Sequence, residues 1–224
     1  MRKLVLFALL LILPALTMRP LTQTAAAPHS DLEEKSICLT FDDGPTDSTT
    51  PHILDILKSE NVKATFFVIG KQVRSREEIL RREYEEGHRI AIHTYSHEYK
   101  AIYTSEETLR SDILQCRKAI LKVLPAWNCD LYRFPGGSWG IRDELKETVK
   151  KMKLRAVDWN ASAEDAVNPA ATADKLFDYV LSSAGNRKHI VLLMHDGVGY
   201  KATVKALPKI IQYFREKGYK FQLL

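Results

Sequence analysis

Two adjacent aspartates, Asp42 and Asp43, end the first apolar run that follows the N-terminal segment, and Gly44 and Pro45 come directly after them. On an extended backbone, neighbouring side chains point to opposite sides, and two carboxylates this close in sequence repel each other. The pair therefore indicates either a cation nearby or different roles for the two groups. A simple turn at the end of a strand is the alternative interpretation, because Asp, Gly and Pro are common turn residues.

A second group of residues that could carry chemistry is the histidine pair His93 and His97, which are four residues apart. On a helical turn this spacing places both imidazoles on one face, within reach of one divalent ion. Imidazole together with carboxylate suits Zn²⁺, and one Asp with two His leaves a position open, as in catalytic zinc sites. By itself the spacing is a weak signal, since histidines four apart also occur by chance.

Short apolar runs alternate with longer amphipathic segments along the rest of the chain. The expected strands are residues 36–41, 64–69, 89–92, 131–134, 154–159, 189–194 and 219–223. The expected helices are residues 50–60, 72–86, 105–124, 142–152, 169–184 and 203–217. This repeated βα order with short connections predicts a parallel α/β sheet in a single domain, either open or closed into a barrel.

Ionisable residues stand at the carboxyl ends of five of these expected strands. They are Asp42 with Asp43, His93, Arg133, Asp158 and His195. In parallel α/β folds the active site forms at this edge of the sheet, where the βα loops meet. Five strands that bring such groups to one rim indicate a functional site rather than scattered caps and surface charges.

The first 27 residues have a different character from the rest. A basic start, Arg2 and Lys3, precedes a short apolar run and a stretch of small residues, which is the layout of a secretory signal peptide. An uncleaved N-terminal anchor is the alternative, although the apolar run is about half the roughly 20 residues of a spanning helix. We expect an exported protein, secreted or in the cell envelope, with residues 28–35 as a linker and 36–224 as the catalytic domain.

The charge of the chain places few limits on its partners. The formal net charge of +5 includes Arg2, Lys3 and Arg19, so a chain cut after residue 27 carries +2. No stripe of Lys and Arg with interleaved aromatic residues indicates nucleic acid. We expect a monomer whose partner is its substrate, with no membrane partner beyond the signal or anchor.

The sequence predicts the environment of Cys38 but leaves open whether the other two cysteines form a disulfide. Cys38 lies inside the first apolar run and is expected to be a buried small hydrophobe. Cys116 and Cys129 lie on an expected helix and in the loop after it. In an oxidising compartment they could form a disulfide, which the sequence leaves open.

Five short motifs, in their order and approximate spacing, resemble the polysaccharide deacetylase family, the NodB homology domain of family 4 carbohydrate esterases. The motifs are Thr40-Phe41-Asp42-Asp43-Gly44-Pro45, His93-Thr94-Tyr95-Ser96-His97, Arg133-Phe134-Pro135-Gly136-Gly137, Asp158-Trp159-Asn160 and Leu193-Met194-His195. The resemblance extends from about residue 35 to the C-terminus. It implies a distorted (β/α) barrel with about seven parallel strands.

The resemblance implies different roles for the two aspartates. Asp43, His93 and His97 would hold one divalent metal ion, with Zn²⁺ expected and Co²⁺, Ni²⁺ or Mn²⁺ as alternatives. Asp42 would be the general base that takes a proton from the attacking water. Arg133 would hold this base in position, a task that suits a planar guanidinium.

The resemblance also implies residues for the later steps of the reaction. His195 would be the general acid that protonates the departing amine, and Asp158 would orient its imidazole and raise its pKa. The backbone N–H of Gly136 would help to stabilise the oxyanion. Trp159 would offer an apolar wall or a stacking face for a sugar, and Leu193 would line the acetyl pocket.

Gly136 and one further residue, Trp139, bear on substrate preference. Gly136 departs from the family's pattern, in which an aromatic residue is frequent at this position, and it would open the cleft. Trp139, like Trp159, flanks a motif and could contact the acetyl methyl or a sugar ring.

These features predict an exported, metal-dependent hydrolase that acts on the acetamide of N-acetylated amino sugars in a polysaccharide. Peptidoglycan N-acetylglucosamine is the first expected substrate and chitin-type oligosaccharides are the second. An O-acetyl esterase of the same family acting on xylan is an alternative, because the same groups would serve both reactions. A catalytically inactive carbohydrate-binding protein is the other, and the intact set of acidic and histidine residues speaks against it.

Overall fold

The computed structural model describes residues 34–224. The expected signal or anchor at residues 1–27 and most of the expected linker lie outside the described residues. Within residues 34–224, none of the helices combines the length and the apolar character that crossing a bilayer requires.

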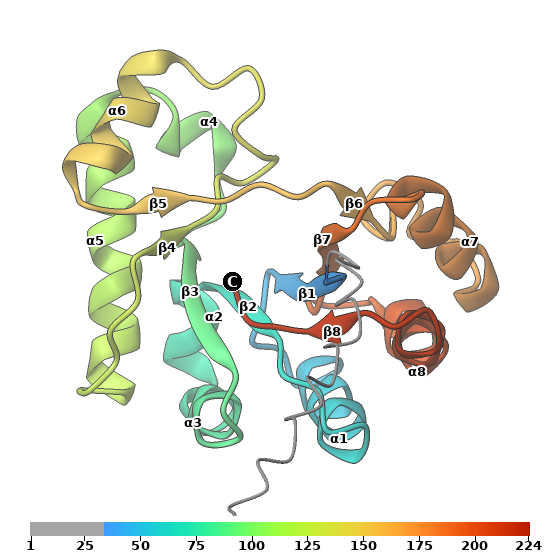
Figure 1. Ribbon diagram of the computed structural model, residues 1–224. Coiled ribbons are helices and arrows are strands. Elements are labelled where there is room, and N and C mark those ends of the chain that lie inside the picture. The colour runs from blue at the N-terminus through green and yellow to red at the C-terminus, as the bar shows by residue number, and fades with distance from the viewer. Residues whose placement is uncertain (1–33) are drawn as a thin grey trace, which may run out of the picture. The chain divides into compact units, whose positions relative to one another are not determined.

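Strands and helices alternate through the part of the chain that the structure describes (Figure 1). The strands are β1 Ser36–Asp42, β2 Thr65–Ile69, β3 Arg89–Thr94, β4 Leu131–Tyr132, β5 Arg155–Ala156, β6 Ala161–Ser162, β7 His189–His195 and β8 Lys220–Phe221. The helices are α1 Thr50–Ser59, α2 Gly70–Ser75, α3 Glu77–Glu85, α4 Tyr99–Ile102, α5 Glu106–Val123, α6 Asp143–Lys151, α7 Ala173–Ala184 and α8 Lys201–Glu216.

All strand pairs are parallel, and seven strands follow one another in the order β5-β4-β3-β2-β1-β7-β6. β8 is an extra strand that pairs only with the start of β1. The two ends of this order, β5 and β6, are separated in the chain by only residues 157–160. The sheet therefore curls until its edges approach each other across that short segment (Figure 1), which confirms the distorted (β/α) barrel.

Several expected elements are shorter in the structure or are divided, and the expected strands at residues 131–134 and 219–223 keep only two residues each, as β4 and β8. The expected strand at residues 154–159 is only the two residues of β5, and β6 was not expected at all. Both are too short to show the alternating pattern by which strands are recognised in a sequence. The expected helix at residues 72–86 is divided into α2 and α3 at Arg76, whose backbone leaves the helical region with φ −140° and whose guanidinium bonds Asp47.

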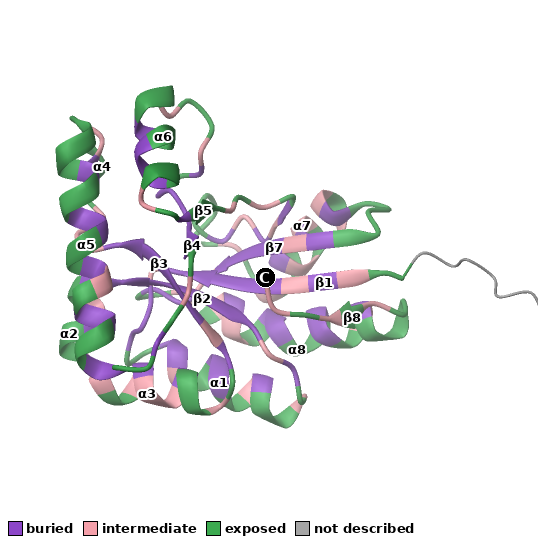
Figure 2. Cartoon of the chain, turned by 60° about the vertical axis from the view of Figure 1, so that its left-hand side comes forward, coloured by how far each residue is buried: buried purple, intermediate pink, exposed green. Residues whose placement is uncertain are grey.

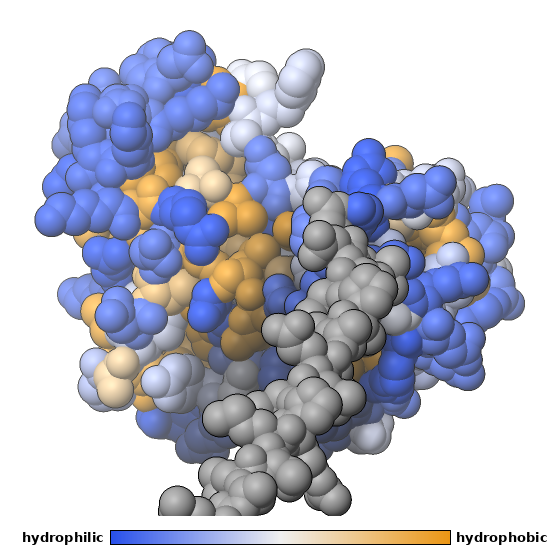
Figure 3. All heavy atoms as spheres, in the orientation of Figure 1, coloured by the Kyte–Doolittle hydropathy of each residue, from blue (hydrophilic) through white to orange (hydrophobic). Residues whose placement is uncertain are grey.

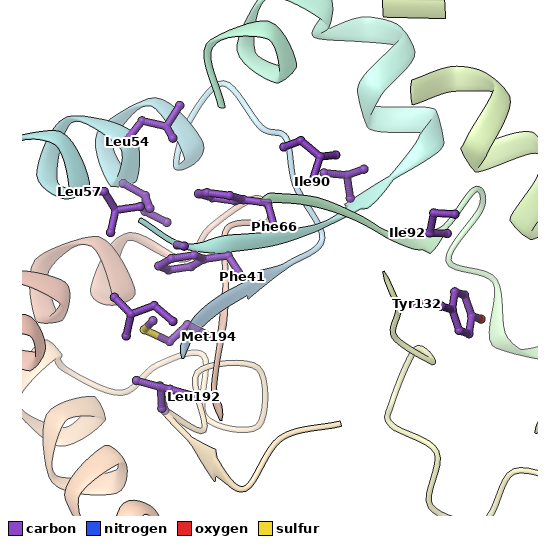
Figure 4. Packing of buried hydrophobic residues seen from close by; sticks show 14 of the residues in the cluster. Phe41, Leu54, Leu57, Phe66, Ile90, Ile92, Tyr132, Leu192 and Met194 are labelled. Atoms are coloured by element: carbon purple, nitrogen blue, oxygen red, sulfur yellow. The ribbon is translucent and has the colours of Figure 1, made fainter. Parts of the chain in front are cut away.

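Alternate residues of each strand face opposite sides of the curled sheet. The outward-facing side chains pack against the surrounding helices and form the main apolar core, in which the rings of Phe41 and Phe66 stack 5.2 Å apart (Figure 4). Burial follows this division, since each large helix is buried along its inner side and exposed along its outer side (Figure 2). The outward positions therefore provide the stability of the fold.

The inward-facing positions form a second layer. Near the amino ends of the strands Phe67, Ala91 and Leu131 make a small apolar cluster. Apolar side chains accordingly gather in the middle of the face shown in Figure 3, over β2, β3 and β4. Two residues further along the chain from Ala91 and Leu131 lie His93, still in β3, and Arg133, directly after the end of β4. Strand alternation thus brings the polar groups into the mouth of the half-barrel.

All three cysteines are free thiols in this structure. Cys116 contacts the carbonyl of Val68 at 3.5 Å, and the sulfur of Cys129 accepts the Leu131 N–H at 3.5 Å, so neither sulfur is paired with the other. Cys38 is half-buried rather than buried as expected, because it faces inward near the start of β1.

Candidate active site

A cavity of about 480 Å³ opens at the carboxyl ends of the strands. Eight of the ten residues predicted from the sequence line it: Asp42, Asp43, His93, His97, Gly136, Trp159, Leu193 and His195. The other two, Arg133 and Asp158, do not line the cavity. Arg133 contacts the lining residue Asp42, and Asp158 contacts Ser138 outside the cavity.

Both aspartates line this cavity, although extended neighbours would point to opposite sides. β1 ends at Asp42, and Asp43 adopts a left-handed backbone conformation with φ +79°. Such a conformation is uncommon for a residue with a side chain and is typical of functional sites. It turns the second carboxylate to the same side as the first.

Gly44 allows this turn to pack against the end of β7. A Cβ atom at position 44 would lie 2.0 Å from Oδ2 of Asp196, a buried residue whose carboxylate also accepts the Thr50 hydroxyl at 2.6 Å. Burial, with the charges of Asp43 and Asp42 adding to it, raises the pKa of Asp196 to about 7. A side chain larger than hydrogen at position 44 would therefore displace the loop that carries Asp43.

The two histidines come together, but not on a helical turn as predicted. His93 belongs to β3, and His97 lies in the following loop with φ +61°. Asp112 of α5 holds this loop. Its Oδ1 accepts the Thr94 hydroxyl at 2.6 Å and the Tyr95 N–H at 2.7 Å, and its Oδ2 accepts the N–H of Ser96 at 3.0 Å.

Asp43, His93 and His97 form a plausible metal site. Their three ligand atoms lie within 4.8 Å of one another, with Nε2 of His97 3.2 Å and Nε2 of His93 3.4 Å from Oδ1 of Asp43. Nδ1 of His93 lies 2.8 Å from the carbonyl oxygen of Arg133 and can donate to it, which leaves the lone pair of Nε2 facing the cavity.

The electrostatics of these three residues fit a cation. Among the described residues, Oδ1 of Asp43 is buried without a hydrogen-bond partner, which is costly unless a cation compensates it. Burial raises the pKa of Asp43, but the neighbouring imidazoles of His93 and His97 have the larger combined effect and lower the pKa to about 2. The carboxylate is therefore charged. A charged carboxylate with two imidazoles is a ligand set that suits Zn²⁺.

Arg133 lies directly behind Asp42 and is fully buried. Its Nη1 donates to Oδ1 of Asp42 at 2.9 Å and to the Thr40 hydroxyl at 2.8 Å, and its Nε donates to the Val157 carbonyl at 3.0 Å. Its guanidinium also stacks on Phe67, 4.1 Å from the ring centroid. The structure therefore brings Arg133 and Asp42 together, in the pairing that the sequence predicted.

The expected pairing of Asp158 with His195 is wrong in this structure. The carboxylate beside His195 is that of Asp165, whose Oδ1 lies 2.7 Å from Nδ1 of the imidazole. Oδ2 of Asp165 accepts the backbone N–H of His195 at 2.9 Å and the Thr203 hydroxyl at 2.7 Å. Burial lowers the pKa of His195, but Asp165, with the charges of Asp42 and Asp43, raises it to about 9.

Asp158 instead fixes the loop that follows β4. Its Oδ1 accepts the backbone N–H of Ser138 at 2.9 Å, and its Oδ2 accepts the Ser138 hydroxyl. The neighbouring Trp159 packs against Gly137, where a Cβ atom would lie 3.0 Å from the indole ring. Asp158 was assigned this role through the motif Asp158-Trp159-Asn160 at the end of an expected strand. Asp165 follows β6, which is too short to be recognised in the sequence.

Two tyrosines that the sequence did not single out line the cavity, Tyr99 and Tyr200. Tyr99 packs edge-on against His97 with 5.0 Å between ring centroids, and its ring would be 3.2 Å from a Cβ atom at Gly136. The space that Gly136 leaves is thus partly filled by Tyr99. Tyr200 stacks on His195, with centroids 5.1 Å apart and planes at 19°.

The two groups suited to proton transfer stand side by side. Asp42 and His195 are the last residues of β1 and β7, and they are direct partners in the register of these neighbouring strands. Each side chain has its own charged partner, Arg133 for Asp42 and Asp165 for His195. The arrangement places one carboxylate and one imidazole at the edge of the Asp43, His93 and His97 cluster.

Comparisons with known proteins agree with this geometry. The family model described as polysaccharide deacetylase matches residues 29–157, more than half of the chain. A peptidoglycan-N-acetylglucosamine deacetylase of Bacillus cereus is 35% identical over 193 residues, covering 84% of this chain and 85% of the relative. A chitooligosaccharide deacetylase of Sinorhizobium fredii is 32% identical over 213 residues, covering 90% of this chain and 96% of the relative.

A similar fold is found among solved structures. A CE4 esterase of Streptococcus mutans has a TM-score of 0.80 to this chain at 32% sequence identity, covering 86% of this chain and 87% of the other. The chain therefore belongs to the polysaccharide deacetylase family.

Proposed function

We propose that this protein removes acetyl groups from N-acetylated amino sugars of a polysaccharide outside the cytoplasmic membrane. The N-acetylglucosamine of peptidoglycan is the first candidate substrate, and chitin-type oligosaccharides are the second. The observation that carries the proposal is the pairing of Asp42 with His195 at the rim of one cavity, beside a cluster of Asp43, His93 and His97.

Asp42 is the general base in this proposal. It is 3% exposed, and the guanidinium of Arg133 holds one of its oxygens at 2.9 Å. Its Oδ2 lies 4.0 Å from Nε2 of His93 and so faces the metal cluster. Asp42 is thereby oriented to take a proton from a water molecule that attacks the acetyl carbon.

His195 is the general acid. Asp165 fixes its Nδ1, so Nε2 carries the proton that can pass to the departing amine. The raised pKa keeps the imidazole protonated near neutral pH, which is what an acid in this step requires.

The remaining groups stabilise charge and position the acetyl group. Bound at Asp43, His93 and His97, a divalent ion such as Zn²⁺ would polarise the carbonyl and lower the pKa of water. The N–H of Gly136, a residue with φ +78° on the cavity wall, is the proposed oxyanion donor. Leu193 and Trp159 also line the cavity and offer apolar surface to the acetyl methyl.

The choice of substrate and location rests on two further supports. Relatives that are 32–35% identical over most of this chain carry the names of peptidoglycan and chitooligosaccharide deacetylases. Residues 1–27 have the basic, apolar and small-residue order of an export signal. Peptidoglycan and chitin are themselves found outside the cytoplasmic membrane.

Acetate release tests the proposal. The purified protein, loaded with Zn²⁺, would be incubated with peptidoglycan, with N-acetylglucosamine oligomers and with O-acetylated xylan. We expect acetate and free amines from the first two substrates, and loss of both products in Asp42→Asn. Acetate released from xylan alone would show an O-acetyl esterase instead of an amide hydrolase. No acetate from any of the three substrates would reject the proposed enzymatic activity.

A further inference from the structure

Trp139 is the most exposed large apolar side chain among the described residues, with 96% of its surface exposed, compared with 72% for Val167. It lies in the loop between β4 and α6, which Figure 1 draws above the segment that runs from β5 to β6. Tryptophan is usually buried over most of its surface, so an indole left in solvent has no role in the stability of the fold. Such a side chain is more readily explained by an external contact.

The loop that carries Trp139 is held in place. Ser138 donates both its N–H and its hydroxyl to Asp158, and the N–H of Gly137 donates to the Phe134 carbonyl at 2.8 Å. Trp159 packs closely against Gly137 on the cavity side. The indole is therefore presented from an anchored backbone, which lowers the entropic cost of contacting a ligand.

Trp139 lies just outside the cavity. Gly136 lines the cavity and Trp139 does not, although they are only three positions apart in the chain. Three residues span at most roughly 11 Å. With the acetyl group of one sugar in the cavity, a neighbouring sugar of the same chain is within reach of Trp139.

The chemistry of an isolated indole favours a glycan over a protein partner. Pyranose rings have an apolar face of C–H groups that stacks on a flat aromatic surface. A stable protein interface would bury a much larger surface, of at least about 1,000 Å² in total. Trp139 is instead followed by the exposed, charged start of α6, where Arg142 pairs with Glu144 at 2.8 Å.

We propose that Trp139 is a stacking platform for a sugar next to the one that occupies the cavity, and that Asp158 positions the loop presenting it. The ligand is an oligosaccharide or polysaccharide chain of N-acetylated amino sugars rather than a single sugar. This inference rests on the proposed function for the identity of the sugar, and it adds a second binding position outside the cavity.

Binding of two sugar lengths tests this position. Dissociation constants for the N-acetylglucosamine monosaccharide and for its pentamer would be measured by calorimetry in the Asp42→Asn background, where turnover does not interfere. We expect Trp139→Ala to weaken pentamer binding roughly five- to tenfold and to leave monosaccharide binding unchanged. Trp139→Phe keeps a flat ring and should retain most of the pentamer affinity.

Two other variants complete the test. Tyr84→Ala removes an exposed aromatic ring from α3 and should change neither constant. Asp158→Ala frees Ser138 and should weaken binding of the pentamer more than that of the monosaccharide, while the pH profile of acetate release, measured with Asp42 intact, stays as in the wild type. Unchanged pentamer binding in Trp139→Ala, or an equal loss for monosaccharide and pentamer, would overturn the proposal.

The outcome is separable from that of the proposed function. If the wild type releases no acetate while the pentamer still depends on Trp139, the enzymatic proposal falls and the sugar platform stands. If acetate is released and Trp139→Ala has no length-dependent effect, the platform falls and the enzymatic proposal stands. A protein that does not bind the pentamer overturns the platform.

Discussion

Oδ1 of Asp165 lies 2.7 Å from Nδ1 of His195, while Oδ2 of the same carboxylate accepts the His195 backbone N–H at 2.9 Å. One buried acid therefore fixes both the ring and the main chain of the imidazole. Burial lowers the pKa of His195, but the hydrogen bond from its ring to Asp165 and the charges of Asp165, Asp42 and Asp43 raise it. This double contact makes Asp165, rather than Asp158, the residue through which the pH dependence of the enzyme can be tested.

Asp165→Asn should move the alkaline limb of the kcat/KM profile to lower pH. An acid must be protonated to act, so activity falls as the pH rises through the pKa of His195. That pKa is about 9 with Asp165 present, and a cation at Asp43 would lower it from there. Removing the negative charge lowers it again, and activity at pH 8 should fall roughly 10- to 100-fold.

Initial rates between pH 5 and 10 would measure this shift, with Asp158→Asn as the matched control. Asp158 contacts Ser138 and not the imidazole, so its substitution should leave the alkaline limb in place. An alkaline limb that moves in Asp158→Asn but not in Asp165→Asn would contradict the assignment.

Asp42→Asn and His93→Ala should separate catalysis from metal binding. The amide cannot accept the proton, so turnover in Asp42→Asn should fall roughly 10²- to 10⁴-fold while the metal stays bound. His93→Ala removes a ligand atom, and metal affinity should fall by more than about 100-fold. Competition with a chromophoric chelator measures the second effect, and full Zn²⁺ binding by His93→Ala would refute the ligand assignment.

Arg133→Ala should destabilise the fold by about 3–5 kcal/mol, because it leaves the buried carboxylate of Asp42 without its charged partner. Urea unfolding followed by circular dichroism would measure the change. Arg215→Ala is the matched control. Its ion pair with Glu60 is also short, at 2.6 Å, but lies on the surface and should contribute less than about 1 kcal/mol. Equal losses in the two variants would argue against a special role for the buried pair.

Gly44→Ala should disturb the metal site as well as stability. The added methyl group would lie 2.0 Å from Oδ2 of Asp196, so the loop bearing Asp43 must shift. Gly218→Ala is a suitable comparison, since its φ of +77° is strained for alanine but the added Cβ meets nothing within 4 Å. We expect weaker Zn²⁺ binding for Gly44→Ala only, measured by calorimetry. Unchanged Zn²⁺ affinity would show that the loop tolerates the methyl group.

Strand alternation was readable from the sequence and explains why so much of the site was predicted. Side chains two apart on a strand share a face, so the run that ends in Asp42 also fixed the side on which its carboxylate lies. The same rule applies to His93 on β3 and His195 on β7. The types of these residues indicated their chemistry, since carboxylate and imidazole are the usual acid, base and metal-binding groups.

Contacts between segments that are distant in the chain could not be predicted from the sequence pattern. Asp158 and Asp165 lie on either side of β6, and the short crossing at residues 157–160 carries the chain from one edge of the sheet to the other. Only that crossing decides which of the two acids meets His195. Likewise, Asp112 reaches the histidine loop from α5, eighteen residues after Thr94.

The sequence by itself determined the kinds of groups at the site, the strand ends that bear them and the parallel α/β architecture. The tertiary structure alone decided which carboxylate holds His195 and which way Asp43 points. The physical reason is that residue type and strand period are local properties. A partner across the sheet, or a left-handed backbone at Asp43, depends on how the whole half-barrel closes.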